Sequence, residues 1–588
     1  MPGFTDPERA SEKKTWPSDC GKYSQCSRRK ETAVTNLTQA NELVKDIALG
    51  KRTNSAPVTK ELRPARFEIK GHSSVKFPIL NSSQTKAIKE ALDNRFTLIQ
   101  GPPGTGKTVV GVHLVYWFFL QNQKVPNHIR PKAANGSSKR RCILYCGPSN
   151  KSVDVVAGQL LKLREVLKPL RVYSEQMEML EFPYPGSNLK LSRRSIREER
   201  PKRELSSITL HHLIRMPENP FSNDIIDFDA RIQMGKDLTD KEIESYKVLL
   251  SHARNHELMR HDVILCTCTA ASNPNFSKLD LQQIIIDECA MATEPEAFIP
   301  LVTHKPEQIV LLGDHKQLQP ITHCDLSARL GMRKSLFERY MEKALMLDTQ
   351  YRMHERICEF PSKEFYKGIL KTRAPRKDSV LLTQSQHLTP ILFGHVDGKE
   401  ISLVVSTERG NENSKANFAE AEESVRIASL LIKRAGVAAR DIAILTPYNA
   451  QVAKVNEILL NNHIQNVNVS TITKSQGSEW RYVILSTVRS CPKSEIDTEP
   501  TKAWLIKMLG FIIDPNQVNV GITRAQEGLC IIGNRELLWC NSLWRKLLVH
   551  YQERGCVVDP AKDIQVQNPH VKTKSKAKVA SKLRKRKC

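Results

Sequence analysis

Residues 101–108 read GPPGTGKT and match the pattern G-x-x-x-x-G-K-T of a phosphate-binding loop. The apolar run FTLIQ precedes this loop and the helical run TVVGVHLVYWFF follows it, which is the order of strand, loop and helix that such a loop needs. Backbone N–H groups of a glycine-rich loop and the first turn of a helix both attract phosphate oxygens. We therefore predict binding of a nucleoside triphosphate by Gly101, Pro102, Pro103, Gly104, Thr105, Gly106, Lys107 and Thr108.

An acidic pair ends the apolar run IIIDE, about 180 residues after the loop. We expect Lys107 to reach the β- and γ-phosphates and the Thr108 hydroxyl to hold a magnesium ion. Asp287, at the carboxyl end of a strand, would hold the same ion through water, and Glu288 would take a proton from the attacking water. Either motif alone arises by chance in long chains, but together and in this context they predict triphosphate hydrolysis with Mg²⁺.

Strands and helices alternate around both motifs. A helical run, SSQTKAIKEAL, leads into the phosphate loop, and strand-like runs occupy 262–270, 284–288 and 308–314. This alternation predicts an α/β fold whose ligands bind at the carboxyl ends of parallel strands. Further strand-like runs at 441–448, 482–488 and 528–534 predict a second α/β unit, with a cleft between the two.

We predict a first unit at 76–344 and a second at 345–552. Charged, mostly helical sequence from about 160 to 258 interrupts the strand pattern, which predicts a helical insertion in the first unit. The basic residues of this insertion fit a grip on a nucleic-acid strand and a solvated helix face equally well.

The two ends of the chain are not expected to form cores. Residues 1–75 are polar and poorly specified, although 62–71 fit one strand. Residues 553–588 form a basic tail whose last 18 residues carry nine Lys or Arg and no acid, which is typical of disorder. Nucleic-acid binding, nuclear import and a solubilising role stay open for this tail. The basic, Pro- and Gly-containing stretch 124–141 is expected to be an exposed loop, either solvated or close to a phosphate backbone.

The chain has 588 residues, with 89 Lys and Arg against 63 Asp and Glu, a formal net charge of +26 and a pI near 9.5. This balance favours a polyanionic partner, nucleic acid first, although an anionic membrane surface also fits. No apolar stretch reaches the ~18 residues of a membrane span, and the N-terminus has no apolar signal core. We expect a protein of the cytoplasm, the nucleus or both.

The fourteen cysteines show no C-x-x-C pair and no Cys and His at zinc spacing, so no metal site other than the magnesium site is predicted. Several of them fall in apolar runs, where a free cysteine behaves as a small buried hydrophobe, as expected in a reducing compartment. Cys20 and Cys26, in the polar N-terminal segment, are either half of a metal site or two unpaired thiols.

The remaining motifs follow the order found in superfamily 1 helicases, from Leu80 to about Cys540. In sequence they are LNSSQ, GPSNKSVD, CTCTAA, GDHKQLQP, QYRMHERICEFPSKEFY, TPYNAQ, SQGSEW and VNVGITRAQEGLCIIGN. The chain resembles the up-frameshift-like branch of superfamily 1B. Its motif sequences are most similar to those of the helicase-with-zinc-finger proteins. It carries no zinc finger or nuclease segment of such large proteins, which leaves a fragment, a short isoform and a separate paralogue open.

The resemblance implies two RecA-like P-loop domains in tandem, with ATP and Mg²⁺ in the cleft between them. Gln84 matches the glutamine that reads adenine, since an amide offers a donor and an acceptor to a base edge. Tyr351 matches the aromatic residue stacked near the adenine, and Glu479 the glutamate that meets the ribose or phosphate network.

Three further positions match the residues that act on the γ-phosphate. Gln317 corresponds to the γ-phosphate sensor, which bridges the nucleotide and the strand grip. Arg352 and Arg524 correspond to arginines of the second unit that reach across the cleft, where a guanidinium fork can contact two oxygens.

The resemblance also implies contacts to a single strand. These contacts fall on Pro148, Ser149, Asn150, Thr267, Thr269, Thr446 and Tyr448. Ser149 fits an ordinary helix N-cap as well, and the two roles are compatible. The chain departs from the family pattern at Thr473, two residues before Ser475, where the family usually has an aspartate.

The function implied is an ATP-dependent helicase or translocase on single-stranded RNA or DNA, with RNA and 5′-to-3′ movement suggested by the resemblance alone. An ATP-dependent nucleic-acid clamp or co-regulator scaffold with little unwinding is the alternative. A P-loop ATPase without a nucleic-acid partner is disfavoured by the charge of +26 and by the motif set. Protein partners, pathway and substrate sequence are not predicted.

Overall fold

The computed structural model describes residues 25–51, 69, 78–124, 139–183, 200–322, 324–373, 379–407 and 410–567. Most of the predicted strand at 62–71, most of the stretch 124–141, Cys20 and the basic end of the tail lie outside these residues. Across the described part of the chain, no helix is both long and apolar enough to cross a bilayer.

The first unit is built on a seven-stranded parallel sheet in the order β3-β4-β2-β5-β6-β1-β7. Its strands are β1 (Phe96–Gln100), β2 (Arg141–Gly147), β3 (Pro169–Arg171), β4 (Val263–Thr267), β5 (Asp280–Ile286), β6 (Gln308–Gly313) and β7 (Leu345–Met346). The strand interiors are buried, as expected when helices cover both faces of a parallel sheet.

Successive residues of these strands enter different cores, because strand side chains alternate between the two faces. On β5, Ile285 packs with α3 (Ser82–Asp93), α4 (Lys107–Lys124) and α5 (Asn150–Leu161). Ile284 and Ile286 pack on the other face, with α10 (Glu294–His304) and the N-terminal helix α2 (Glu42–Ala48). This sandwich places the ends of β1, β2, β4, β5 and β6 along one edge, where the predicted nucleotide and strand motifs lie.

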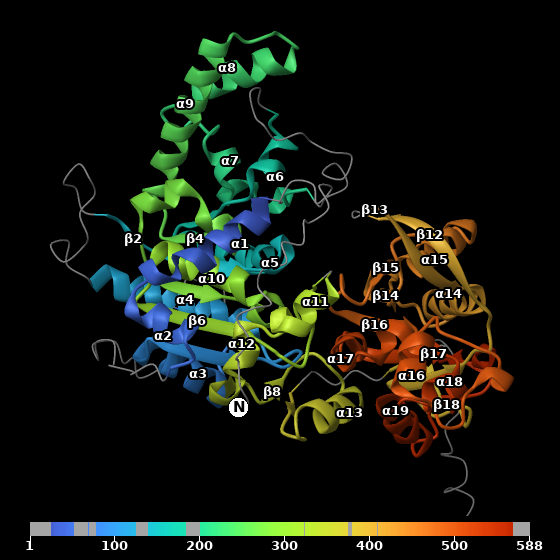
Figure 1. The fold of residues 1–588 in the computed structure, drawn as a ribbon. Coiled ribbons are helices and arrows are strands. Elements are labelled where there is room, and N and C mark those ends of the chain that lie inside the picture. Colours follow the sequence, from blue (N-terminus) through green and yellow to red (C-terminus); the bar gives the residue numbers. More distant parts are fainter. Residues whose placement is uncertain are drawn as a thin grey trace, which may run out of the picture.

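The second unit has a six-stranded parallel sheet in the order β15-β14-β16-β17-β11-β18. Its strands are β11 (Ile391–His395), β14 (Ile442–Thr446), β15 (Asn468–Thr471), β16 (Trp480–Ser486), β17 (Ala525–Gly533) and β18 (Val557–Val558), and its larger helices are α14 (Phe418–Lys433), α15 (Asn449–Asn461), α17 (Pro515–Ile522) and α19 (Ser542–Gln552). Figure 1 shows the two sheets as separate layered bodies joined through α13 (Glu355–Phe365) and its flanking segments. The predicted α/β fold with two tandem RecA-like units is confirmed.

Smaller elements connect these bodies or lie at their margins. In the second unit a hairpin of β12 (Glu400–Thr407) and β13 (Gly410–Asn417) packs beside α15. The others are β8 (Thr349–Gln350), β9 (Lys371–Thr372), β10 (Leu381–Leu382), β19 (Gln565–Val566), α11 (Asp325–Ser327), α12 (Leu336–Arg339), α16 (Lys502–Leu509) and α18 (Arg535–Trp539).

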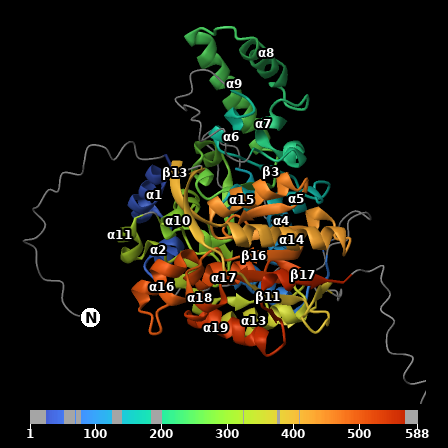
Figure 2. The same cartoon turned by 90° about the vertical axis from the view of Figure 1, so that its right-hand side faces the viewer.

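The helical insertion begins later than the sequence pattern indicated. The range predicted as helical, about 160 to 258, includes β3, a three-residue edge strand paired with β4. Only after β3 does the chain form α6 (Glu175–Met179), α7 (Leu210–Leu213), α8 (Ser222–Gln233) and α9 (Asp240–Leu258). Figures 1 and 2 both show α8 and α9 projecting far beyond the first sheet.

Part of the poorly specified N-terminal segment covers the first unit. Helix α1 (Gln25–Thr35) contacts α10, and Arg29 donates a hydrogen bond to the carbonyl of Thr269, at 2.9 Å. The last turn of α2 is fixed by Arg339 and Tyr340, which donate to backbone carbonyls there. These contacts explain why short amphipathic helices without a strong pattern of their own are ordered here: most of their partners come from the rest of the unit.

Candidate active site

The phosphate loop has the strand, loop and helix context that the sequence predicted. It leaves β1 at Gln100 and enters α4 at Lys107. Gly104 and Gly106 have φ of +74° and +84°, a left-handed backbone that favours glycine. A Cβ at Gly106 would also lie 2.7 Å from the Gln84 side-chain amide, so the loop tolerates no side chain there. The side chain of Lys107 points into the loop and donates to the Gly101 carbonyl at 2.7 Å.

The acidic pair lies beside this lysine. Glu288 Oε1 is 3.8 Å from Lys107 Nζ, and Glu288 has φ of +49°, a conformation that is uncommon outside glycine. The buried Asp287 accepts hydrogen bonds from the Tyr145 hydroxyl and from the Glu288 backbone N–H. Burial and, after it, the Glu288 charge raise the pKa of Asp287 to about 6. A divalent cation would counter both effects.

The oxygen donors needed for Mg²⁺ share one cavity of about 420 Å³. Its lining includes Thr108, Asp287 and Glu288. Hydroxyl and carboxylate oxygens are the ligand types that Mg²⁺ prefers, usually with several waters retained. The donor set at this position therefore fits a magnesium ion held by Thr108 and Asp287.

A second cavity, of about 460 Å³, lies between the two units and is lined by both. The first unit contributes the loop from Pro102 to Thr108 together with Glu288 and Gln317, and the second contributes Gly477, Glu479 and Arg524. Tyr351 and Arg352 line it from the connecting segment, where the Tyr351 N–H donates to the Gly104 carbonyl at 2.8 Å. The structure thus gathers most predicted nucleotide contacts, and the catalytic candidates apart from Asp287, around one cleft.

Gln84 lies behind the loop rather than on the cavity lining. Its Oε1 accepts the N–H of Asn81 in a capping box, and its Nε2 donates to the Thr105 carbonyl at 3.0 Å. An amide NH₂ has two hydrogens, so one donor remains for a base edge. The predicted adenine contact of Gln84 stays a prediction.

The two predicted arginines are held by partners on both sides of the cleft. Arg352 donates to the Glu479 carboxylate and to the Thr523 carbonyl. Burial alone would raise the pKa of Glu479, but Arg352 and further neighbours lower it. Arg524 is only 1% exposed, and its Nη2 donates to Gln317 Oε1 of the first unit at 3.0 Å. Burial, and then the charge of Arg352, lowers the pKa of Arg524 to about 9.

Arg524 and Gln317 belong to a wider hydrogen-bond network that the motifs did not reveal. Asp314 accepts from Gln317 at 2.8 Å, from Tyr366 at 2.7 Å and from Gln100 at 3.1 Å. From α17 of the second unit, two asparagines close the network: Asn516 donates to the Gln317 carbonyl and Asn519 to both the Lys316 carbonyl and the Tyr366 hydroxyl.

Comparisons with known proteins agree with this arrangement. Two family models, each described as an AAA domain, match residues 79–325 and 332–536. The human protein named 3'-5' exoribonuclease HELZ2 is 53% identical over 552 residues, which is 92% of this chain and 19% of that protein. The regulator of nonsense transcripts 1 homolog of Neurospora crassa is 32% identical over 526 residues, which is 87% of this chain and 42% of that protein.

The chain belongs to the up-frameshift-like branch of the superfamily 1 helicases. It spans about a fifth of the human relative and about two fifths of the fungal one. Among solved structures, the PRRSV helicase aligns with 77% of this chain and 54% of that chain, at 13% identity and a TM-score of 0.31, which is too low to add to the argument.

The helicase strand motifs of the first unit lie at the sheet edge next to the nucleotide cleft. Pro148 and Ser149 follow β2, and Asn150 begins α5. Ser149 is exposed and caps α5 by accepting the Ser152 N–H. Thr267 and Thr269 follow at the end of β4 and are half-buried. The predicted N-cap at Ser149 is confirmed, and the predicted strand contacts of all five stay predictions.

In the second unit Thr446 and Tyr448 are both buried, with exposed fractions of 0% and 6%. The Tyr448 ring packs against Phe511, and its hydroxyl accepts from Arg489 at 3.4 Å. The predicted contacts of these two residues to a nucleic-acid strand stay predictions.

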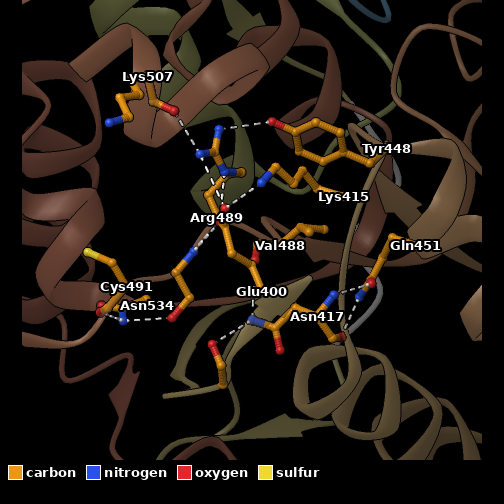
Figure 3. Close-up of polar contacts among 12 residues, drawn as sticks. Glu400, Lys415, Asn417, Tyr448, Gln451, Val488, Arg489, Cys491, Lys507 and Asn534 are labelled. Atoms are coloured by element: carbon orange, nitrogen blue, oxygen red, sulfur yellow. Dashed lines mark hydrogen bonds and ion pairs between the residues drawn. The ribbon is translucent and has the colours of Figure 1, made fainter. Parts of the chain in front are cut away.

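The cover over Tyr448 is an ion-pair cluster, shown in Figure 3. Arg489 donates to the Glu400 carboxylate and to the Lys507 carbonyl, both at 2.8 Å. Lys415 pairs with the same carboxylate at 3.1 Å. Glu400 and Lys415 come from the β12–β13 hairpin, which the sequence pattern did not predict.

Two further contacts join the helicase units near the strand motifs. Gln476 of the second unit donates to Glu288 Oε2 at 3.1 Å, and Lys151 of α5 donates to the Lys474 carbonyl at 2.7 Å. Thr473, which replaces the usual aspartate, bonds to the Thr471 hydroxyl at 3.0 Å. The predicted catalytic base is thus linked directly to the segment that follows Thr473.

Proposed function

We propose that this chain is an ATP-dependent nucleic-acid helicase or translocase that acts on single-stranded RNA. One observation carries the proposal: Arg524 of the second unit bonds to Gln317 of the first within the cavity that the phosphate loop lines. A γ-phosphate at this point would contact basic groups of both units, so its loss would weaken their attachment.

The hydrolytic step is assigned to residues of the first unit, with charge support from the second. Glu288 takes a proton from the water that attacks the γ-phosphorus, while the bond to the leaving β-phosphate oxygen breaks and ADP retains that oxygen. Lys107, Arg352 and Arg524 stabilise the charge spread over the phosphoryl oxygens. Mg²⁺, held by Thr108 and Asp287, supplies further positive charge when bound.

The contacts that cross the cleft couple ATP hydrolysis to binding of the nucleic-acid strand. Gln476 bonds to Glu288, and Lys151 of the strand-binding edge bonds to the Lys474 carbonyl. When the units separate after hydrolysis, these contacts break together. The affinity for the nucleic-acid strand therefore changes with the nucleotide that is bound. The net charge of +26 supports attraction to the phosphate backbone.

The proposal includes RNA as the nucleic acid along which the protein moves, movement in the 5′-to-3′ direction, and a cytoplasmic or nuclear location. The regulators of nonsense transcripts support the choice of RNA, and the free cysteines suit a reducing compartment. Single-stranded DNA is the second probe, because a net charge of +26 attracts either polyanion.

The test measures ATP hydrolysis with and without single-stranded RNA and DNA, at two salt concentrations. We expect stimulation by RNA that falls with salt, and its loss in Lys107→Ala. Unstimulated hydrolysis, or full stimulation in Lys107→Ala, would refute the proposal. Displacement of a strand from duplexes with a 5′ or a 3′ tail then separates unwinding from ATP-dependent clamping, which would hydrolyse ATP without displacement.

A further inference from the structure

Three side chains with metal-binding atoms converge at the root of the helical insertion, outside the linings of the two cavities described above. Glu181 follows α6, and His211 and His212 are neighbours in α7. Nε2 of each histidine lies 2.9 Å from the same carboxylate oxygen, Glu181 Oε2. Their metal-binding atoms all lie within 4.8 Å of one another.

The two distances to Glu181 are close to what a tetrahedral zinc ion requires. With Zn–N near 2.0–2.1 Å and Zn–O near 2.0–2.2 Å, ligand atoms of one tetrahedron are about 3.3 Å apart. The two N–O distances are a few tenths of an ångström shorter, a difference that small side-chain rotations would remove. Two imidazoles and one carboxylate form a known zinc donor set, with a fourth position for water.

The surroundings favour neutral imidazoles and an available carboxylate. His211 is 2% exposed, and its burial lowers the pKa of the ring, outweighing the nearby charges of Glu178 and Glu181. A neutral ring has the free lone pair that a metal needs. Glu178, one helical turn earlier, is already committed to Arg254, whose Nη2 donates to both carboxylate oxygens at 2.8 and 2.9 Å.

Aromatic side chains and a second committed arginine enclose the cluster. Phe182 makes edge contacts with both histidine rings, and the Arg215 guanidinium stacks over Phe182 at 3.7 Å from its centre. Arg215 is itself paired with Asp229, at 2.6 Å. The guanidinium nearest to Phe182 is thus neutralised, which lowers the repulsion that a cation entering the cluster would meet.

We propose that Glu181, His211 and His212 bind one Zn²⁺ ion that joins the end of α6 to α7 at the base of the helical insertion. Glu181 and His211 are 30 residues apart in the chain, so a metal bridge between them closes a long connection. Such a bridge orders the base from which α8 and α9 project (Figure 1). The site is structural and independent of the ATP chemistry.

The test compares metal binding by the whole chain after treatment with a chelator. Co²⁺ alone is titrated first, followed by displacement with Zn²⁺. We expect the unmodified chain to bind one equivalent more than Glu181→Gln or His212→Gln, with the visible absorption of a tetrahedral Co²⁺ site and a rise in melting temperature with Zn²⁺. The matched control is His252→Gln, which alters an exposed histidine of α9 and should keep the equivalent.

Equal metal stoichiometry and equal spectra in the unmodified chain and in Glu181→Gln would overturn the proposal and leave a triad held by hydrogen bonds only. X-ray absorption at the zinc edge of the unmodified chain gives an answer that does not depend on any variant folding. Two imidazoles with oxygen ligands are expected there. A shell of sulfur ligands, which the cysteines would supply, would contradict the assignment.

Discussion

The two units contribute different things to the shared cleft. The first supplies groups at a strand end and a helix start, where Lys107 and Glu288 lie 3.8 Å apart beside the loop. The second supplies the almost completely buried Arg524, whose guanidinium is fixed by Gln317 and by the carbonyls of Val520 and Ser478. In the proposed mechanism the first unit therefore holds and hydrolyses the nucleotide, and the second detects that the γ-phosphate is present.

Each unit also contains a buried carboxyl group whose pKa is raised, and the two groups have different surroundings. Asp287, whose pKa is raised to about 6, stands where a cation can bind. Glu420 of α14 accepts hydrogen bonds from the Ser486 hydroxyl and the Val488 N–H, and burial raises its pKa to about 8. Val488 has φ of +71°, which is strained for a β-branched residue, so Glu420 fixes the backbone beside the Arg489 cluster. In the proposed mechanism Asp287 thus holds a cation, whereas Glu420 fixes the backbone conformation at Val488.

Replacing Arg524 of the second unit should have the largest effect on ATP turnover. We expect Arg524→Ala to lower the turnover number for ATP roughly 10³–10⁵-fold, with nucleotide affinity largely kept because the first unit still grips the phosphates. Steady-state hydrolysis and binding of a fluorescent nucleotide check this. The control is Arg440→Ala, an exposed arginine of the same unit. Equal losses of affinity and turnover would erase the proposed division between the units.

Replacing Glu288, the proposed catalytic base of the first unit, should lower ATP turnover by a smaller factor. Glu288→Gln keeps the size of the side chain but cannot take a proton, so we expect turnover to fall by roughly 10²–10⁴-fold, with nucleotide binding unchanged. The exposed Glu307→Gln serves as control. Turnover in Glu288→Gln within a few-fold of the unmodified chain would assign the base to another group.

The buried acid of the first unit predicts a gain in stability at the expense of function. Because the folded-state pKa of Asp287 lies above its unfolded value, the folded state loses stability as pH rises from about 4 to about 6. Asp287→Asn should then raise the free energy of unfolding at pH 7.5 by about 1–3 kcal/mol without Mg²⁺, and abolish hydrolysis. Urea unfolding at pH 5 and pH 7.5 measures this, and a variant that is less stable at both pH values would contradict it.

The buried acid of the second unit, Glu420, predicts an effect on stability alone. Because its folded-state pKa of about 8 lies above the ordinary value of 4.5, the unmodified chain should lose stability as pH rises from about 4.5 to about 8. Glu420→Gln carries no titrating group, so its advantage in stability should grow over this pH range, to about 1–3 kcal/mol, and stay constant above pH 8. Unfolding curves of both chains from pH 5 to pH 9.5 check this, and a stability difference that does not grow below pH 8 would assign a normal pKa to Glu420.

The sequence predicted the parts of the site that depend on local order. A phosphate loop needs its strand, glycines and helix in one continuous stretch, and Asp287 and Glu288 end a strand, so neighbouring residues in the chain carried the signal. The two-unit α/β fold followed from the same regular alternation.

The sequence could not predict the parts that depend on distant packing. Tyr448 contacts Arg489, and Arg489 is held by Glu400 of a hairpin that lies much earlier in the chain. Asp314, Asn516 and Asn519 meet only because two units face each other. Likewise, Glu181 and His211 come together through the fold of the insertion, since their spacing matches no zinc pattern.

The central claim is that the γ-phosphate joins the two units and thereby controls the affinity for a single nucleic-acid strand. The most direct measurement is the affinity for a fluorescent single-stranded RNA, at fixed salt, with ADP and with a non-hydrolysable ATP analogue. The account predicts affinities that differ between the two nucleotides by roughly 5–150-fold in the unmodified chain and become equal in Arg524→Ala. Equal RNA affinities with both nucleotides in the unmodified chain would contradict it.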